Sequence, residues 1–236
     1  MPLPENIQKE IYQYCENHLP DDKSWYNNQF EFIEDADLRQ RLCMEFKSIR
    51  FAYKLYEGIN ANDENKIFEI RSQIIAYASL YEAVLHYVLY EYYNDTREFH
   101  EMQYHCVPTR IDIPRPQLET LNKLLNHNGE TIITYHKQER KKEETQVRFD
   151  AKCKTAEKLG IIHNFKNHDG EIVNLVQELI EIYEYRNAIH LIAEQRKGIT
   201  YEIDLSKRAY RRMRPFIDQV KGKLKEDGKS IYSIRF

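Results

Sequence analysis

Apolar residues recur every three or four positions in several long segments of the chain, which is the spacing of one face of an α-helix. The pattern predicts helices at about residues 4–18, 37–57, 64–93, 118–125, 150–159, 170–191 and 206–225. The segment 64–93 is apolar around much of its circumference, with Ile70, Ile74 and Leu85 on its main stripe. A helix of this kind is expected at the centre of a bundle or of a dimer.

Two regions between these helices carry different patterns. Residues 94–116 include Pro108, Pro114 and Pro116 and are predicted to be irregular. Further on, two segments rich in β-branched and aromatic residues flank a charged run, and they predict a β-hairpin or loop over residues 131–149. The predicted fold class is therefore all-α, a helical bundle with a small inserted β-hairpin.

The same pattern divides the chain into three parts. An N-terminal helix and loop occupy residues 1–36, a helical domain that contains the hairpin occupies 37–226, and a short tail occupies 227–236. The polar stretch before residue 37 and the end of the last amphipathic segment set these boundaries.

Composition adds several exclusions for this chain of 236 residues. Only 7 Gly and 7 Pro argue against a β-sandwich or barrel, which would need many turns. No apolar run approaches the roughly 18 residues of a membrane span, and the first residues lack a signal-peptide pattern. The prediction is a cytoplasmic protein with no membrane partner, whose 4 scattered cysteines are free thiols. Phosphate-binding loops, dinucleotide fingerprints and zinc-protease motifs do not occur, so no cofactor or metal is predicted.

Charge is distributed unevenly along the chain. Residues 1–185 hold 22 Lys and Arg against 32 Asp and Glu, whereas residues 186–236 hold 13 against 6. A basic C-terminal region behind an acidic body is compatible with an anion-binding surface and equally with a solvated helix face.

The predicted helix over 170–191 carries two polar residues on its apolar side. At about 100° per residue, the positions within about 40° of Ile172 are Val176, Leu179, Tyr183, Arg186 and His190. Arg186 and His190 are four residues apart, so their side chains leave the helix as neighbours. A buried arginine needs a partner or a bound anion, because an uncompensated buried charge is strongly unfavourable.

Two structural explanations for this pair stay open. In the first, the helix leaves the core near Tyr185, which puts both residues at a solvated end. Alternatively, Arg186, His190 and Glu194, which follow one another at intervals of four, form a satisfied network.

The order of these elements also indicates a family. A long apolar helix with the small-residue centre Ile74–Ala83 precedes a helix that carries Arg186, Asn187 and His190. Over roughly residues 37–225 this arrangement resembles the HEPN superfamily, all-helical domains marked by an Arg, commonly followed by Asn, Asp or His, with a His a few residues later. The resemblance implies an HEPN-like antiparallel helical bundle. Three residues separate Arg186 from His190, where the family's nuclease motif usually has four to six.

The resemblance also implies a chemistry, because active HEPN members are metal-independent ribonucleases that pair their motifs across a symmetric dimer. His190 would take the proton from a ribose 2′-OH, Arg186 would bind the scissile phosphate, and Asn187 would orient the phosphate or His190. The residue types suit these roles. An imidazole titrates near neutrality and a guanidinium offers a fixed fork of donors to phosphate oxygens.

Basic residues of the last helix are candidates for binding an RNA backbone, because they follow the motif closely in the sequence. They are Lys207, Arg208, Arg211 and Arg212. The alternative interpretation is an ordinary solvated face of an amphipathic helix.

Two functions are carried forward from the sequence. The first is an HEPN-like endoribonuclease, active as a homodimer and acting as a toxin or antiviral-defence effector on RNA. The second is a non-catalytic HEPN-like module for dimeric interaction or ligand sensing, in which Arg186 and His190 hold a dimer interface or a ligand's phosphate. A third interpretation is a helical scaffold whose hairpin and tail dock a regulatory protein partner.

Overall fold

A computed structural model describes residues 1–20, 23–125, 128–130, 133–188 and 200–229. The chain divides into two compact units, one made of Met1–Asn94 and Phe149–Phe236 and the other of Asp95–Arg148. The structure is mostly α-helical with a small antiparallel hairpin, as the sequence predicts. No helix among the described residues combines the length and the apolarity that crossing a lipid bilayer requires.

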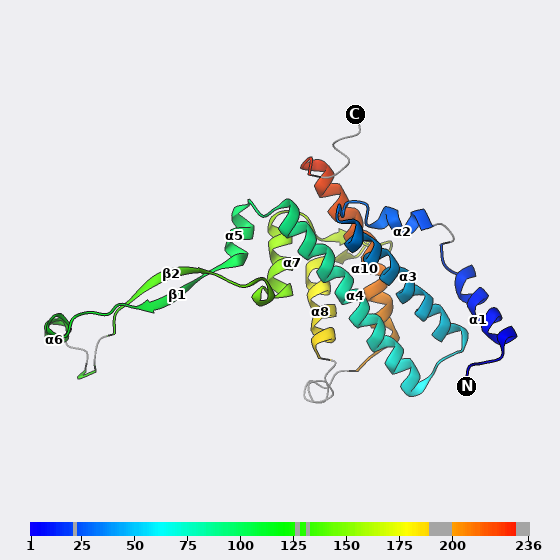
Figure 1. Ribbon diagram of the computed structural model, residues 1–236, viewed down its shortest axis with the longest axis horizontal. Helices are drawn as coiled ribbons and strands as arrows, with labels where there is room; N and C mark the ends of the chain where they lie inside the picture. Colours follow the sequence, from blue (N-terminus) through cyan, green and yellow to red (C-terminus); the bar gives the residue numbers. More distant parts are fainter. Residues whose placement is uncertain (21–22, 126–127, 131–132, 189–199, 230–236) are drawn as a thin grey trace. The chain divides into compact units, whose positions relative to one another are not determined.

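The first unit is a helical bundle with short strands at one point of the chain (Figure 1). Its elements are α1 (Glu5–Asn17), α2 (Lys23–Gln29), α3 (Ala36–Gly58), α4 (Asp63–Tyr92), α7 (Phe149–Lys158), β3 (Phe165–Lys166), β4 (Ile172–Val173), α8 (Leu175–Asn187) and α10 (Ile203–Glu226). The helices predicted at 4–18, 37–57 and 64–93 are confirmed within one or two residues as α1, α3 and α4.

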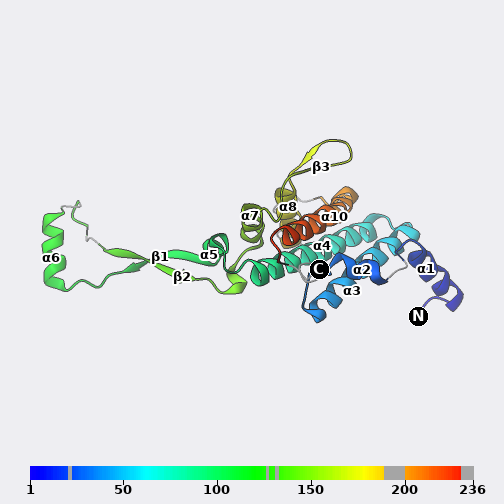
Figure 2. The same cartoon turned by 90° about the horizontal axis from the view of Figure 1, so that it is seen from above.

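Helix α4 lies at the centre of this unit and packs against α3, α7, α8 and α10 (Figure 2). Its apolar residues Ile74 and Leu85 are fully buried, which confirms the expected central helix. The apolar residues that flank this stripe near the start of α4 are an exception. Phe68 and Ile75 keep 60% and 38% of their surface exposed, so the first turns of α4 are covered less completely than the middle.

Side chains from α4 join it to the last helix of the bundle. The buried Tyr81 hydroxyl donates a hydrogen bond to the carbonyl oxygen of Ala209 over 2.6 Å, and the Tyr81 ring meets Phe216 edge to face at 5.0 Å. Near the far end of α4, the hydroxyl of Tyr93 donates to the Asp227 carboxylate over 2.7 Å. Tyr93 follows Tyr81 along the chain, and its partner Asp227 follows Ala209, the partner of Tyr81. The two helices α4 and α10 therefore run parallel.

Local caps explain where several helices begin and end. The Asp35 carboxylate accepts the backbone N–H of Leu38 at the start of α3, and Gly160 follows α7 with φ +71°, a conformation that suits glycine. The start predicted for the last helix, at residue 206, is wrong. α10 begins at Ile203 after Glu202, so Ser206 lies inside the helix and not at its N-cap.

The predicted helix over 170–191 also starts later than expected. Residues 165–173 form the short β3–β4 ladder, and the side chain of Asn174 caps α8 by accepting the N–H of Gln177. The reference residue of the helical wheel, Ile172, therefore lies in β4 and is 72% exposed. Only the described part of this helix, Leu175–Asn187, can be compared with the wheel.

The second unit is built around a two-stranded antiparallel sheet. Its elements are α5 (Arg97–Gln103), β1 (Tyr104–Arg110), α6 (Arg115–Leu124), β2 (Tyr135–Lys141) and the 3-10 turn η1 (Glu144–Gln146). The ladder pairs Tyr104 with Lys141 at one end and Arg110 with Tyr135 at the other.

This unit corrects two predictions made from the sequence. Residues 94–116 are not irregular throughout, because 97–110 form α5 and β1, and Pro108 sits in β1 opposite Lys137. The hairpin exists, but its strands are β1 and β2, and residues 145–149 form part of η1 and the start of α7. A two-stranded sheet has only edge strands, so a proline without an N–H is tolerated there.

All four cysteines are free thiols, as predicted, but their environments differ. Cys15, Cys43 and Cys153 are buried and Cys106 is exposed on β1. Burial raises the pKa of the three inner thiols, because it disfavours the charged thiolate. Of the predicted tail, 227–236, residues 230–236 lie outside the described residues.

Candidate functional site

The end of α8 carries the motif residues that the structure describes. Arg186 and Asn187 are the last two residues of α8, and the buried Ala188 is its C-cap. His190 lies outside the described residues. Arg186 follows the buried Leu179 and Ile182 by seven and four positions, so it extends the inner side of the helix and is partly buried. A cation in the last turn also interacts favourably with the helix dipole.

Neutral groups surround the Arg186 guanidinium. It lies 5.0 Å from the centroid of the Tyr183 ring, a cation–π distance. Its Nη1 donates to the Tyr183 hydroxyl over 3.3 Å and to Oδ1 of Asn187 over 3.0 Å. In the described part of the chain no carboxylate forms an ion pair with Arg186. The N–H groups on Nε and Nη2 of Arg186 can therefore donate to an anion.

Side chains from α4 and α7 hold Tyr183 in position. The Tyr183 hydroxyl donates to Oε1 of Glu82 over 3.0 Å, and Nζ of Lys152 lies 3.9 Å from the same oxygen. The ring of Phe149 stacks on the Tyr183 ring at 4.4 Å. Burial, and after it the Glu82 carboxylate, raises the pKa of Tyr183, so its hydroxyl stays protonated and keeps donating to Glu82.

Glu82 and Lys152 support the site but are not among the residues predicted from the sequence. The sequence does contain a feature that points to Glu82. It is an acidic residue in the most apolar helix of the chain, between Ala78 and Val84. An acid in such a position is expected to have a buried partner. Which residue provides the partner depends on how α7 packs on α4, and the sequence does not show this.

The four candidate RNA-binding residues of α10 face two different ways. Arg208 forms an ion pair with Glu181 at 3.3 Å, and Arg212 binds both carboxylate oxygens of Glu178, one of them over 3.1 Å. The Arg212 side chain is only 16% exposed. These two arginines therefore hold α10 against α8.

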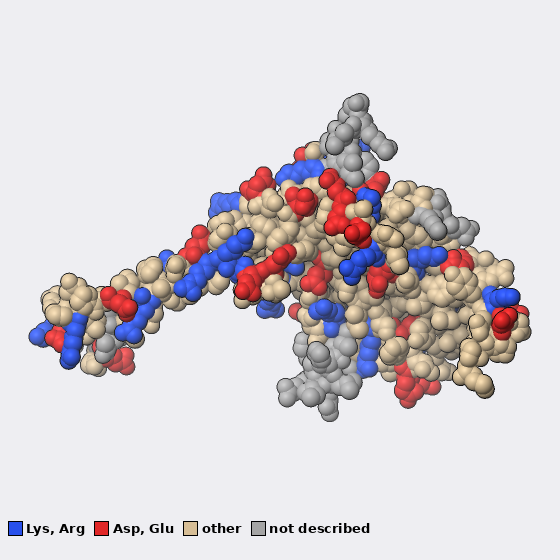
Figure 3. Space-filling model, in the orientation of Figure 1, with Lys and Arg blue, Asp and Glu red and all other residues tan. Residues whose placement is uncertain are grey.

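Lys207 and Arg211 occupy the other side of α10. They line a pocket toward α3, together with residues of α3 and α4. Over the helical unit, the face shown in Figure 3 has Lys and Arg side chains interspersed with Asp and Glu. Of the four candidate RNA-binding residues, two therefore pair with α8 and two face the pocket.

In comparisons with known proteins, no family model, no curated protein and no solved structure matches the chain. The fold is that of a mostly α-helical protein with an inserted hairpin unit. Its function is argued below from its own residues.

Proposed function

We propose that the chain is a metal-independent endoribonuclease of the HEPN type that works as a homodimer. The observation that carries the proposal is the Arg186 guanidinium, which is partly buried at the end of α8, held by the neutral groups of Tyr183 and Asn187, and not neutralised by any described carboxylate. A cation held in this way is preorganised for a phosphate.

In the proposed reaction the 2′-oxygen of a ribose attacks the adjacent phosphorus. His190 accepts the 2′-OH proton, and Arg186 stabilises the negative charge that grows on the phosphoryl oxygens. The bond to the 5′-oxygen breaks, this oxygen takes a proton from solvent, and a 2′,3′-cyclic phosphate remains. Asn187 acts as a positioning residue, because its Oδ1 accepts a hydrogen bond from Arg186.

Exposed apolar residues support the dimer in this proposal. Phe68 and Ile75 are seven residues apart, which places them on the same side of α4. A symmetric contact that includes this side would bury both of them.

The test is cleavage of RNA by the purified full chain in the presence and absence of a chelator. We expect cutting that the chelator does not affect and that falls at least about 100-fold in Arg186→Ala and in His190→Ala. Arg214→Ala is the matched control, because Arg214 is 90% exposed on α10 and pairs only with Asp218 in its own helix among the described residues. Its cleavage rate should equal that of the wild type.

Cellular RNA provides the complementary assay, because expression in cells supplies any activator that a purified system lacks. Intact cellular RNA, together with intact RNA in the purified assay, would contradict the ribonuclease proposal. Equal cleavage by the wild type and the Arg186→Ala variant would contradict the role of this residue.

A non-catalytic interaction module is the second candidate, and one observation favours it. Nη1 of Arg186 already donates to two groups on α8, and through Tyr183 this network reaches Glu82. Such a network can serve stability alone. In that case Arg186→Ala and His190→Ala change the melting temperature or the dimer mass, while no cleavage is present in the wild type.

A further inference from the structure

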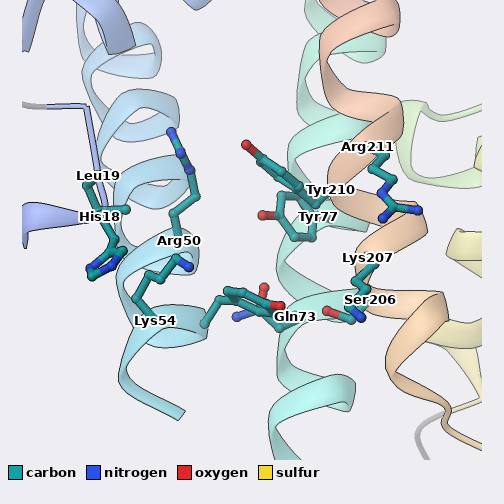
Figure 4. A pocket seen from close by; sticks show the side chains of 11 residues that line it. His18, Leu19, Arg50, Lys54, Gln73, Tyr77, Ser206, Lys207, Tyr210 and Arg211 are labelled. Carbon is teal, nitrogen blue, oxygen red and sulfur yellow. The ribbon is translucent and has the colours of Figure 1, made fainter. Parts of the chain in front are cut away.

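A pocket of about 310 Å³ lies between α3 and α10, beside α4 (Figure 4). It belongs to a different side of the bundle from the Arg186 site. Gln73 of α4 lines the pocket, and Glu82 follows nine residues later, about 180° around the helix. In the same way, Lys207 and Arg211 of α10 face the pocket, whereas the neighbouring arginines pair with α8.

Among the described residues, the pocket is lined by cations from two helices and by no acidic side chain. Arg50 and Lys54 are one turn apart on α3, and Lys207 and Arg211 are one turn apart on α10, so the two pairs lie on opposite walls of the pocket (Figure 4). A concave site with charges of one sign attracts ions of the opposite sign.

The two arginines keep most of this positive charge available. Outside the pocket lining, Lys54 pairs with Glu57 at 2.6 Å and Lys207 reaches Asp204 at 4.0 Å. Arg50 and Arg211 form no ion pair with the described carboxylates. The site therefore contains two guanidinium groups whose charge no described carboxylate neutralises.

Arg50 is held in position by aromatic rings. Its guanidinium carbon lies 5.1 Å from the Trp25 ring centroid, 6.0 Å from that of Phe46 and 5.6 Å from that of Tyr210. Its Nη1 is buried and has no hydrogen-bond partner among the described residues. An oriented donor without a partner is unfavourable in the empty protein and favourable as soon as an acceptor enters.

Ser206 provides a second unsatisfied donor. This residue is 1% exposed, lies in the first turns of α10 and points into the pocket (Figure 4). Its Oγ has no hydrogen-bond partner among the described residues. A buried serine in a helix would normally bond a carbonyl of the preceding turn, so an unpartnered hydroxyl aimed at a cationic pocket indicates a missing acceptor.

The remaining walls are aromatic. Tyr77 forms part of the floor and Tyr210 part of the rim, with their ring centroids 6.1 Å apart. Burial raises the pKa of Tyr77, so its hydroxyl is neutral and adds no negative charge to the site. The lining thus combines donors for an anion with ring faces for an organic group.

We propose that this pocket binds a small organic molecule through a phosphate group, with Arg50, Arg211 and Ser206 donating to the phosphate oxygens and Tyr210 covering the organic part. The volume lies at the lower end of small-ligand pockets, roughly 300 to 1,000 Å³, and exceeds what a single phosphate ion needs. An RNA backbone is the less suitable ligand, because a polymer running over the surface does not enter a pocket of this size between two helices. This proposal does not depend on the ribonuclease proposal.

Calorimetric titration of the full chain tests the proposal with phenyl phosphate, pyrophosphate, inorganic phosphate and benzoate. We expect phenyl phosphate to bind with a Kd of about 1 mM or tighter, and benzoate, which lacks the phosphate, not to bind. Phenyl phosphate that binds about tenfold more tightly than inorganic phosphate identifies an organic phosphate as the ligand. Equal affinities support the same phosphate site with the free anion as its ligand.

Substitutions then assign the binding to this pocket. Arg211→Ala should weaken phenyl phosphate binding at least about tenfold, because a charge-assisted hydrogen bond is lost, while the exposed Arg214→Ala control binds as the wild type does. Ser206→Ala should weaken binding about fivefold and leave the melting temperature of the empty protein unchanged or raised, because the hydroxyl that it removes has no described partner.

Three results would overturn the proposal. The first is that no phosphate probe binds at a concentration 10-fold above the expected Kd. The second is binding that Arg211→Ala and Ser206→Ala leave unchanged. The third is that a short single-stranded RNA displaces phenyl phosphate in an Arg211-dependent but Ser206-independent way. The last result would assign the basic residues to an open RNA surface.

Discussion

The Phe216→Ala substitution is expected to lower the free energy of unfolding by about 4 kcal/mol. Phe216 is fully buried in α10 and packs edge to face on Tyr81 of α4 at 5.0 Å. Alanine removes this aromatic contact and leaves a cavity between the two helices, which the surrounding main chain can fill only in part.

Equilibrium denaturation of the variant and the wild type, followed by circular dichroism, measures this effect. Phe68→Ala is the matched control, because Phe68 is 60% exposed on α4 and its removal should cost less than about 1 kcal/mol. A loss below about 1 kcal/mol in Phe216→Ala would mean that α4 and α10 are not packed as described.

The Glu82→Gln substitution is expected to lower the free energy of unfolding by about 2 to 3 kcal/mol. Glutamine keeps an oxygen that can accept the hydroxyl of Tyr183, so the change removes mainly the negative charge. The Lys152 side chain is only 6% exposed, and its Nζ lies 3.9 Å from Glu82 Oε1, so its ammonium group loses one nearby countercharge. The estimate is below the usual cost of breaking a buried pair because Glu82 is itself 30% exposed.

A double-mutant cycle with Lys152→Met isolates the interaction between the two charges. Methionine has a similar shape without the charge, so the double variant should recover a large part of the stability lost in Glu82→Gln. Additive losses in the two single variants would show that the charges are not coupled.

The long amphipathic helices were predictable because their pattern is local. Spacings of three and four residues define α3 and α4 without reference to any other segment. Glycine at the end of α7 and the polar break before α4 likewise act on their immediate neighbours. The predicted central position of α4 followed from the same local pattern.

The strands were predicted less well because their pairing is not local. β1 pairs with β2 across α6, so a β-prone segment such as 145–149 could not be distinguished from a true strand by its own composition. Pro108 made β1 resemble a loop, although an edge strand tolerates proline.

The candidate sites show the same limit. The sequence placed Arg186 on the inner side of its helix, but the support from Glu82 and Lys152 comes from two other helices. The pocket at Arg50 and Ser206 joins residues more than a hundred positions apart. A single sequence contains no record of such a convergence, since it depends on the packing of α3 and α10 against α4.

The distribution of thiols between the surface and the core has a practical consequence. Cys106 on β1 should react with an alkylating reagent at once, whereas Cys153 can react only when the bundle opens. Pulse labelling followed by mass spectrometry would therefore record the opening of the helical unit through Cys153, with Cys106 as an internal reference for reagent access. The protein carries its own reporter of local unfolding and needs no introduced probe.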